Sequence, residues 1–589
     1  RYQHSLLAEG EYIPGDDGSE TNFIVSAVNI EENGQREPIP YVIPPGIERE
    51  VNFGTTNYVF QNEQSIQLEA VNLLDGDARG VFKTTEFDFR QFKNLQMYVH
   101  AEKRFEEQEL DYGDMTVFIR IGSDFTDNYY EYELPVQFTK WYTTAAQRDS
   151  IWPEINNFNI VLEDLVQVKQ NRNVAMRDPN TDLALYKPYS EFSNNARITV
   201  LGSPSISDVK GILIGVRNPK RIGTGLDDDG NPISAIVWVD ELRLTDFNDK
   251  PGWAATGRVE ATLADLGRVA VSASHSSAGF ASLEKKITQI PLEYVTDFLV
   301  TTDLQLGKFF SEKAGVSLPL HVDYGISKIT PEYNPLQPDI KLKDDLDTYT
   351  NKQNRDSVKR LVEDYTSRTN VNLMNVRKTR TDNKKKPKVY DVENFDVSFA
   401  YSKVDHRNID YEYDDRKEYR GGFGYNYNGR PKNYVPLERA NAFKSKSLAL
   451  IKDFNFYLLP KVLSFRTDMN RQIHEILYRD KSLGDVIFYP TVYRVWNWYR
   501  IFDFKYDFSK SLSFEFNAGA NTYIKEPVMY PDKDTEEWEE YKQAVWDDIL
   551  SFGTMQRYNQ SLKVTYNVPL KKIPIIDWIT IAASVQTLY

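Results

Sequence analysis

The sequence has 589 residues, with 71 lysine or arginine residues against 86 aspartate or glutamate residues, a formal net charge of -15 and no cysteine. The acidic balance argues against nucleic acid as a partner, and the absence of cysteine excludes disulfides and a cysteine nucleophile. Aromatic residues reach 13% at a mean hydropathy of -0.54, which is typical of many β-strands, and no long apolar run predicts a membrane helix.

Residues 1–49 are expected to form an irregular lead-in segment. The first ten residues lack a charged start followed by an apolar stretch and a small-residue cleavage site. The sequence is therefore expected either to follow a removed signal peptide or to be an internal piece of a longer protein.

Residues 50–250 are predicted to fold as a β-sandwich or jelly roll, because short alternating segments are separated by Gly, Asp, Asn and Pro turn signals. The run at 235–244 resembles the last strand of carbohydrate-binding jelly rolls, so sugar binding is one interpretation. In the other interpretation Trp238, Leu242 and Leu244 are core residues and Asp240 caps a turn.

A weak calcium candidate lies inside this region. Asp227, Asp229 and Asn231 offer oxygen ligands at alternating positions, as calcium loops do. The distal glutamate of an EF-hand loop is absent, and Asp-Gly is also a strong hairpin turn. A calcium site and a plain turn are both open interpretations.

Residues 251–589 are predicted to form about twelve transmembrane β-strands, because apolar residues recur at every second position over about nine residues or more. Soluble antiparallel sheets alternate as well. Long strands, connections that alternate short with long, and Trp496, Trp498 and Trp578 near expected strand ends favour a membrane barrel.

Connections are expected in two classes. Tight turns are expected at 266–267, 308–315, 410–417, 460–461, 509–510 and 570–574. Longer connections are expected at 278–296, 328–392, 429–445, 475–490 and 521–557, and those at 328–392 and 521–557 are predicted to be long extracellular loops with partly helical spacing. By parity, the N-terminal sandwich should lie on the extracellular side.

The alternation also predicts which side chains line a pore and which face lipid. The predicted pore-lining residues are Asp503, Lys505, Asp507, Ser513, Glu515, Asn517, Thr580, Ser584 and Gln586. The predicted lipid-facing residues are Phe502, Phe504, Phe508, Phe514, Phe516, Ile579, Ile581 and Val585.

Catalytic and metal motifs are absent from the sequence. It contains no GxSxG, Walker, GxGxxG or HExxH motif, and its six histidines show no close metal-ligand spacing. We therefore expect no enzyme and no cofactor. The paired carboxylates of a glycoside hydrolase stay an open alternative, because the fold sets their separation.

Several segments are similar to one known family. They are NEQS at 62–65, DGDAR at 75–79, FKNLQMYVHAE at 92–102, WVDELRL at 238–244, PEYNPLQPDI at 331–340 and LSFRTDMNR at 463–471. Together they resemble the SprA/Sov family of type IX secretion translocons, and the resemblance spans most of the chain.

The resemblance implies an all-β protein that is part of a very large antiparallel transmembrane β-barrel with an extracellular jelly-roll or β-sandwich cap. Folded proteins, including surface adhesins for gliding motility, would leave the cell through it. The implied location is the outer membrane of a Gram-negative, Bacteroidota-like bacterium. The implied partners are a PorV-type barrel, a plug protein, exported type IX substrates and membrane lipid or lipopolysaccharide.

This sequence is much shorter than members of that family. A sheet of about twelve strands in lipid must close on itself or continue, because open edges leave backbone groups unpaired. We expect it to continue, and a small complete barrel ending at Tyr589 is the alternative. The alternative function is that of an extracellular carbohydrate-binding or adhesin β-sandwich protein without a pore.

Overall fold

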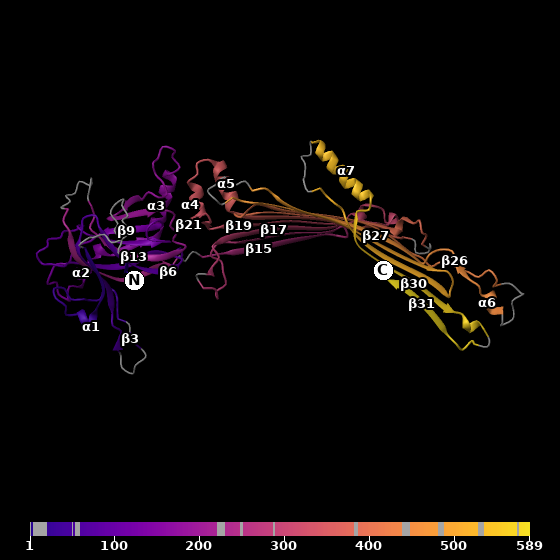
Figure 1. The fold of residues 1–589 in the computed structure, drawn as a ribbon, viewed down its shortest axis with the longest axis horizontal. Coiled ribbons are helices and arrows are strands. Elements are labelled where there is room, and N and C mark those ends of the chain that lie inside the picture. The colour runs from indigo at the N-terminus through magenta and orange to yellow at the C-terminus, as the bar shows by residue number, and fades with distance from the viewer. Residues whose placement is uncertain are drawn as a thin grey trace. The chain divides into compact units, whose positions relative to one another are not determined.

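The protein is described by a computed structural model that covers residues 2–3, 21–49, 51–52, 59–220, 230–247, 251–286, 289–381, 387–438, 448–480, 488–527, 535–573 and 576–588. The fold is all-β, and the chain divides into two compact units. The N-terminal unit comprises Arg1–Gly252, Ala278–Glu293 and Pro331–Val358, and the long-sheet unit comprises Trp253–Ser277, Tyr294–Thr330 and Lys359–Tyr589 (Figure 1). In the part of the chain so described, each helix is too short or too polar to cross a lipid bilayer.

Two antiparallel sheets build the N-terminal unit. The seven-stranded sheet has the order β1 (Tyr2–Gln3), β6 (Ala78–Phe87), β13 (Val209–Arg217), β8 (Thr116–Gly122), β9 (Tyr129–Pro135), β12 (Ala196–Leu201) and β11 (Tyr189–Ser193). The five-stranded sheet has the order β10 (Phe158–Val161), β7 (Phe92–Lys103), β14 (Ile233–Phe247), β5 (Gln64–Leu73) and β2 (Asn22–Asn29).

One hydrophobic core joins the two sheets. Leu68, Val99 and Val237 contribute to it from the five-stranded sheet, and Ile119 and Val216 contribute from the seven-stranded sheet. Each is almost completely buried. Aliphatic and β-branched side chains at alternate positions are what two facing sheets bury. The N-terminal unit thus has a core of its own, while its jelly-roll topology stays a prediction.

For β14, the prediction of core residues is confirmed for Trp238 and wrong for Leu242. Trp238 is fully buried, and its ring lies 6.2 Å from that of Trp152, as expected of a core residue. Leu242, however, is 38% exposed. The register of β14 against β7 shifts between Asp240 and Arg243, so the alternation that would have buried Leu242 is broken there.

The lead-in segment is more regular than predicted. Asn22–Asn29 forms β2 at the edge of the five-stranded sheet, because Phe23 and Val28 are buried against it. The remaining elements of this unit are α1 (Ile30–Asn33), β3 (Val51–Asn52), β4 (Val59–Phe60), α2 (Arg148–Ile151), α3 (Leu162–Ala175), β20 (Tyr333–Asn334), β21 (Gln337–Lys341) and α4 (Leu342–Asp347).

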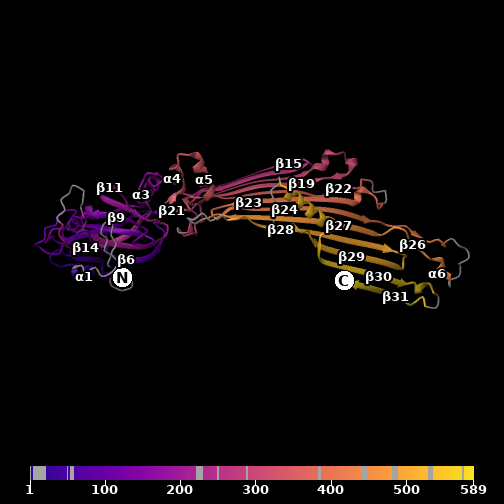
Figure 2. The ribbon, with the colours of Figure 1, turned by 45° about the horizontal axis from the view of Figure 1, so that its top comes forward.

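The second unit is one long antiparallel sheet whose strands lie side by side in chain order (Figure 2). Its order is β15 (Ala254–Leu263), β16 (Gly267–Ser276), β17 (Glu293–Gln305), β19 (Pro319–Pro331), β22 (Asp364–Lys378), β23 (Phe395–Arg407), β24 (Tyr411–Asn428), β27 (Val462–Tyr478), β28 (Thr491–Asp507), β29 (Leu512–Tyr523), β30 (Thr554–Val568) and β31 (Ile581–Leu588). The short β18 (Val316–Ser317) pairs with β22, and α5 (Lys352–Val362), α6 (Ala449–Lys452), α7 (Glu536–Leu550) and the hairpin of β25 (Asn433–Tyr434) with β26 (Phe456–Tyr457) lie in connections.

The predicted long loop at 328–392 is wrong in its middle. Asp364–Lys378 forms β22, which pairs with β19 on one side and β23 on the other. Its apolar alternation is weak because Ser367 and Thr369 occupy positions whose direct partners in β19 are Ile326 and Tyr324. A bulge between Leu373 and Val376 then shifts the pattern by one residue. The ends of the predicted loop at 521–557 lie in β29 and β30, and α7 lies between these strands. Its extracellular position stays a prediction.

The two ends of the long sheet differ in their connections. The loop end, where β15 begins, carries 277–292, 332–363, 408–410, 479–490 and 524–553. The turn end carries 264–266, 306–318, 379–394, 429–461, 508–511 and 569–580. The expected regular alternation of short with long is wrong in the middle of the sheet, because the tight turn at 408–410 lies at the loop end and 429–461 lies at the turn end.

Candidate functional site

The predicted pore-lining residues of the last four strands lie in continuous cross-strand rows. Directly paired residues of an antiparallel sheet point to the same face. The rows are Asp503–Asn517–Ser561, Lys505–Glu515–Lys563–Gln586 and Asp507–Ser513–Thr565–Ser584. Thr580 lies one residue before β31 and joins no row. The register thus gathers these side chains on one polar face, and their role as a pore lining stays a prediction.

The predicted lipid-facing residues lie in the alternate rows of the same strands. These rows are Phe465–Phe502–Ala518, Leu463–Phe504–Phe516–Leu562, Tyr506–Phe514–Val564–Val585 and Val568–Ile581. Phe508 follows β28, with its ring 4.8 Å from that of Tyr506, and Ile579 precedes β31. These residues form the apolar face of the sheet, opposite the polar face.

Among the described residues, the apolar face has no protein core behind it. Phe502 is 39% exposed, Ile581 49% and Val585 64%. Within the described strands of the long sheet, the buried apolar side chains are limited to Tyr427, Ala518 and Ala520. Contiguous exposed apolar surface of this kind marks contact with lipid or with another protein.

Charged side chains begin on the apolar face at a defined level in four neighbouring strands, β23, β24, β27 and β28. The aromatic run of β23 ends before Lys403, and that of β24 begins after Lys417; these two lysines are directly paired. The boundary then steps toward the turn end, to Arg471 in β27 and Arg500 in β28. Such stepping along the register is what tilted strands crossing a slab require.

Beyond this boundary, protein covers the same face of β28. Arg500 is 8% exposed, its guanidinium donates to the Phe552 carbonyl oxygen at 3.2 Å and lies 4.6 Å from the Trp498 ring centroid. The prediction that Trp496 and Trp498 lie near strand ends is wrong, because both lie inside Thr491–Asp507. Phe552, two residues after the end of α7, contributes to this cover, with its ring 5.9 Å from that of Trp498.

The outer strands leave backbone edges open. All ten residues of β15 and all eight residues of β31 are exposed. Within the residues that the structure describes, each of these strands pairs on one side only, β15 with β16 and β31 with β30. An unpaired strand edge in hydrocarbon costs several kcal/mol per orphaned backbone group, about the cost of a lost hydrogen bond in an apolar medium.

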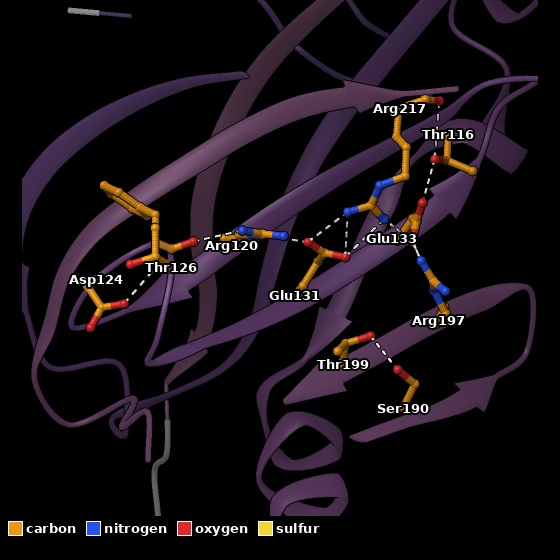
Figure 3. A network of polar contacts seen from close by, with 11 residues as sticks. Thr116, Arg120, Asp124, Thr126, Glu131, Glu133, Ser190, Arg197, Thr199 and Arg217 are labelled. Carbon is orange, nitrogen blue, oxygen red and sulfur yellow. Dashed lines mark hydrogen bonds and ion pairs between the residues drawn. The ribbon is translucent and has the colours of Figure 1, made fainter. Parts of the chain in front are cut away.

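A buried ion-pair network crosses the seven-stranded sheet of the N-terminal unit (Figure 3). Glu131 lies 2.6 Å from Arg120 and 3.1 Å from Arg217. Arg217 also contacts Glu133, which Arg197 approaches at 2.6 Å. The network ties β13, β8, β9 and β12 together through their side chains. The sequence offers no local signal for it, because its members come from separate strands.

The family-like segment 331–340 docks onto the N-terminal unit through one carboxylate. Asp339 is 2% exposed and accepts from the Lys169 ammonium at 2.8 Å and from the Tyr130 hydroxyl at 2.5 Å. Burial lowers the pKa of Lys169 against the opposing effect of Asp339. Arg90 lies 4.9 Å from the ring centroid of Tyr333. A loop of the long sheet thus supplies a buried ion pair to the N-terminal unit.

The predicted calcium site is only partly described. Asp227 and Asp229 lie outside the described residues. The backbone oxygen of Asn231 accepts from the Asn218 amide at 3.0 Å. Calcium binding at these residues stays a prediction.

A different group of carboxylates could hold a hard cation. Glu63, Asp240 and Glu241 bring their oxygen atoms within 4.8 Å of one another. Burial raises the pKa of Asp240, which accepts a hydrogen bond from the Tyr41 hydroxyl at 3.1 Å. Sequence reasoning missed the group because Glu63 and Asp240 are far apart in the chain.

Comparison with known proteins gives one family. A family model described as SprA_N, a motility related/secretion protein, matches residues 2–346. The match covers more than half of the chain and includes the docked segment with Asp339. No curated protein matches the chain.

Acid should weaken the N-terminal unit through Glu131. Burial alone raises the pKa of this carboxyl, but Arg217 and Arg120 outweigh burial and lower the pKa from 4.5 to about 2. Its stabilising effect is therefore complete above pH 4.5 and is lost as the pH falls toward about 2. Urea denaturation at several pH values measures this loss of stability, with the oxidation of the buried Met97 and Met115 as the readout of unfolding.

Glu131→Gln should flatten this pH dependence, whereas Glu107→Gln, which alters an exposed carboxyl, should leave it unchanged. Equal slopes in the two variants would contradict the assignment.

Asp339→Asn should release the docked segment. The change leaves the buried Lys169 ammonium without its carboxylate, which costs about 3–5 kcal/mol. Hydrogen exchange of residues 333–346 in the intact protein should accelerate. Asp344→Asn, at an exposed carboxyl of the same segment, is the matched control. Equal protection in the two variants would show that the ion pair does not hold the segment.

Proposed function

Because the chain belongs to the SprA/Sov family of motility-related and secretion proteins, we propose that it forms part of an outer-membrane protein-conducting channel, the translocon of the type IX secretion system. The long sheet is part of the wall of a very large antiparallel barrel. The N-terminal unit is its extracellular cap. Folded proteins, including surface adhesins for gliding motility, leave the cell through the channel.

The observation that carries this proposal is a sheet with two unburied faces of opposite character. A soluble sheet of this length would bury its apolar face against a second layer. Here Phe502, Ile581 and Val585 stay exposed. Acyl chains cover such a face without leaving polar groups unsatisfied. Lys403 and Arg500 mark where the lipid-covered part of this face ends, on the side of the loop end.

The open edges support a wall larger than this sheet. In hydrocarbon, β15 and β31 need further strands to satisfy their backbone groups. The bore of a barrel grows with its number of strands, and a wall that continues well beyond twelve strands encloses a channel wide enough for a folded domain. The polar face, with Lys505 and Glu515, then borders water.

The orientation follows from the two ends of the sheet. Two of the three longest connections, 332–363 and 524–553, lie at the loop end. Segments 278–293 and 331–358 from this end belong to the N-terminal unit. Outer-membrane barrels place short turns in the periplasm and long loops outside. The cap therefore lies outside the cell, in a Bacteroidota-like Gram-negative bacterium.

The partners follow from the same proposal. A broad hole in the outer membrane requires a plug, and a PorV-type barrel receives exported type IX substrates. Lipid and lipopolysaccharide cover the apolar face. The chain acts as a channel and not as an enzyme. Its net charge of -15 disfavours nucleic acid as a partner.

The alternative, a carbohydrate-binding or adhesin β-sandwich protein without a pore, has less support. Trp238, the aromatic residue of the run at 235–244, is fully buried, so it offers no platform for stacking on a sugar. A function as a soluble β-sandwich adhesin also does not explain why the apolar face of the long sheet is exposed.

Deletion of the protein should abolish export of type IX substrates. Cells lacking it should retain these substrates in the periplasm, and a plasmid copy should restore their release. Fractionation of cells and medium measures both. Normal export in the deletion strain would contradict the proposal. Extraction of the protein without detergent would instead favour the adhesin.

Phe504→Arg should impair assembly in the outer membrane. A cationic side chain on the lipid face costs about 2–4 kcal/mol near the bilayer midplane. The fraction of protein that resists extraction by urea measures assembly. Asp503→Arg introduces the same side chain on the opposite face of the same strand and should assemble normally. Equal loss in both variants would contradict the assigned faces.

A further inference from the structure

Opposite charges recur two residues apart along single strands of the long sheet. Residues i and i+2 of a strand share a face and lie about 7 Å apart along the backbone. An arginine can span that distance to reach a carboxylate. The pairs and their shortest nitrogen–oxygen distances are Arg258–Glu260 (3.0 Å), Asp414–Arg416 (3.1 Å), Glu418–Arg420 (2.7 Å) and Arg466–Asp468 (2.7 Å).

All four pairs lie on the polar face. The register links the Glu418–Arg420 pair of β24 to neighbouring strands through two rows. These rows are His321–Asn372–Ala400–Arg420–Asn470 and Asp323–Asn370–Ser402–Glu418–Gln472. Arg466 pairs directly with Ile501, which lies on the same face of β28 as Asp503 and Lys505.

Cross-strand pairs supplement the pairs along strands. Arg268 of β16 contacts Asp303 of β17 at 2.8 Å. Lys505 of β28 contacts Glu515 of β29 at 3.4 Å. At these positions of the described sheet, cations and carboxylates therefore alternate along the strands and across them.

Stability does not explain this arrangement. The side chains of Arg258, Arg416, Arg420 and Arg466 are 56–67% exposed. Exposed ion pairs contribute little to the free energy of folding. The pairing has a different consequence, which is that it removes net charge from each small area of the wall.

The length scales decide what a passing protein experiences. The paired charges lie closer together than the Debye length, which is about 8 Å at physiological ionic strength. At that distance the field of a paired cation and anion largely cancels, whereas a cluster of one sign attracts every cargo of opposite charge. A locally neutral wall therefore retains neither acidic nor basic cargo proteins by electrostatic attraction.

We propose that the charge pairs of the polar face make the channel indifferent to the net charge of its cargo. Its substrate class is then folded proteins of either sign, selected by their export signal and not by attraction to the wall. This inference rests on the proposed function, because it requires the polar face to border the export path.

The test uses the full protein in cells that lack the chromosomal copy. The cargo is one small globular domain in an acidic and a basic version, each fused to a type IX export signal. The reversal variant combines Arg416→Glu with Arg420→Glu and creates four neighbouring carboxylates. The swap variant combines Glu418→Arg with Arg420→Glu and keeps the pair in inverted order. Initial export rates are divided by the amount of protein in the outer membrane.

Wild type should export both cargos at similar rates. The reversal variant should slow the basic cargo by about tenfold relative to the acidic one, which corresponds to about 1.4 kcal/mol of retention. The swap variant should behave as wild type. If the reversal variant does not assemble, Arg466→Glu in β27 makes the same test on another strand.

Two results would overturn the inference. One is equal export of both cargos by the reversal variant. The other is a charge preference in the swap variant as large as that of the reversal variant. Failure of the wild-type copy to restore export of either cargo would instead contradict the proposed function itself.

Discussion

The two-residue period of the strands in the long sheet is the constraint on which its other properties depend. Apart from register shifts near strand ends, direct pairing from β19 to β31 keeps side chains on the face that their parity assigns. Asp503 and Lys505 therefore stay apart from Phe502 and Phe504. A slip of one residue would move an entire strand's aromatic residues to the polar face. The register shift in β22, between Leu373 and Val376, lies near the turn end of its strand, where it disturbs few rows.

The two units satisfy their side chains in different ways. The N-terminal unit buries Leu68 and Val237 in its own core and pairs its buried charges, as Glu131 does with Arg217. The long sheet has almost no core and pairs its charges in the open. The first solution needs no other molecule. In the proposed function, a bilayer around an aqueous channel supplies the apolar medium on one face and the water on the other.

Local alternation was sufficient to predict the strands from β27 to β31 and the division of Phe502 and Asp503 between two faces. It was not sufficient for β22, where Ser367 and Thr369 dilute the apolar pattern and a bulge shifts it. The contact of Asp339 with Lys169 was beyond sequence reasoning, because its partners are 170 residues apart. The segment around Asp339 stood out by family resemblance, whereas the carboxylate that anchors it became evident only from burial and distance.

Electron cryo-microscopy of the protein purified from outer membranes in detergent tests the central claim most directly. We predict a detergent belt against the face that bears Phe502, Phe504 and Ile581, with further strands hydrogen-bonded to β15 and β31 and a water-filled space bordered by Asp503 and Lys505. Phe502 and Phe504 packed in a dry protein interior, without a belt around the molecule, would contradict it.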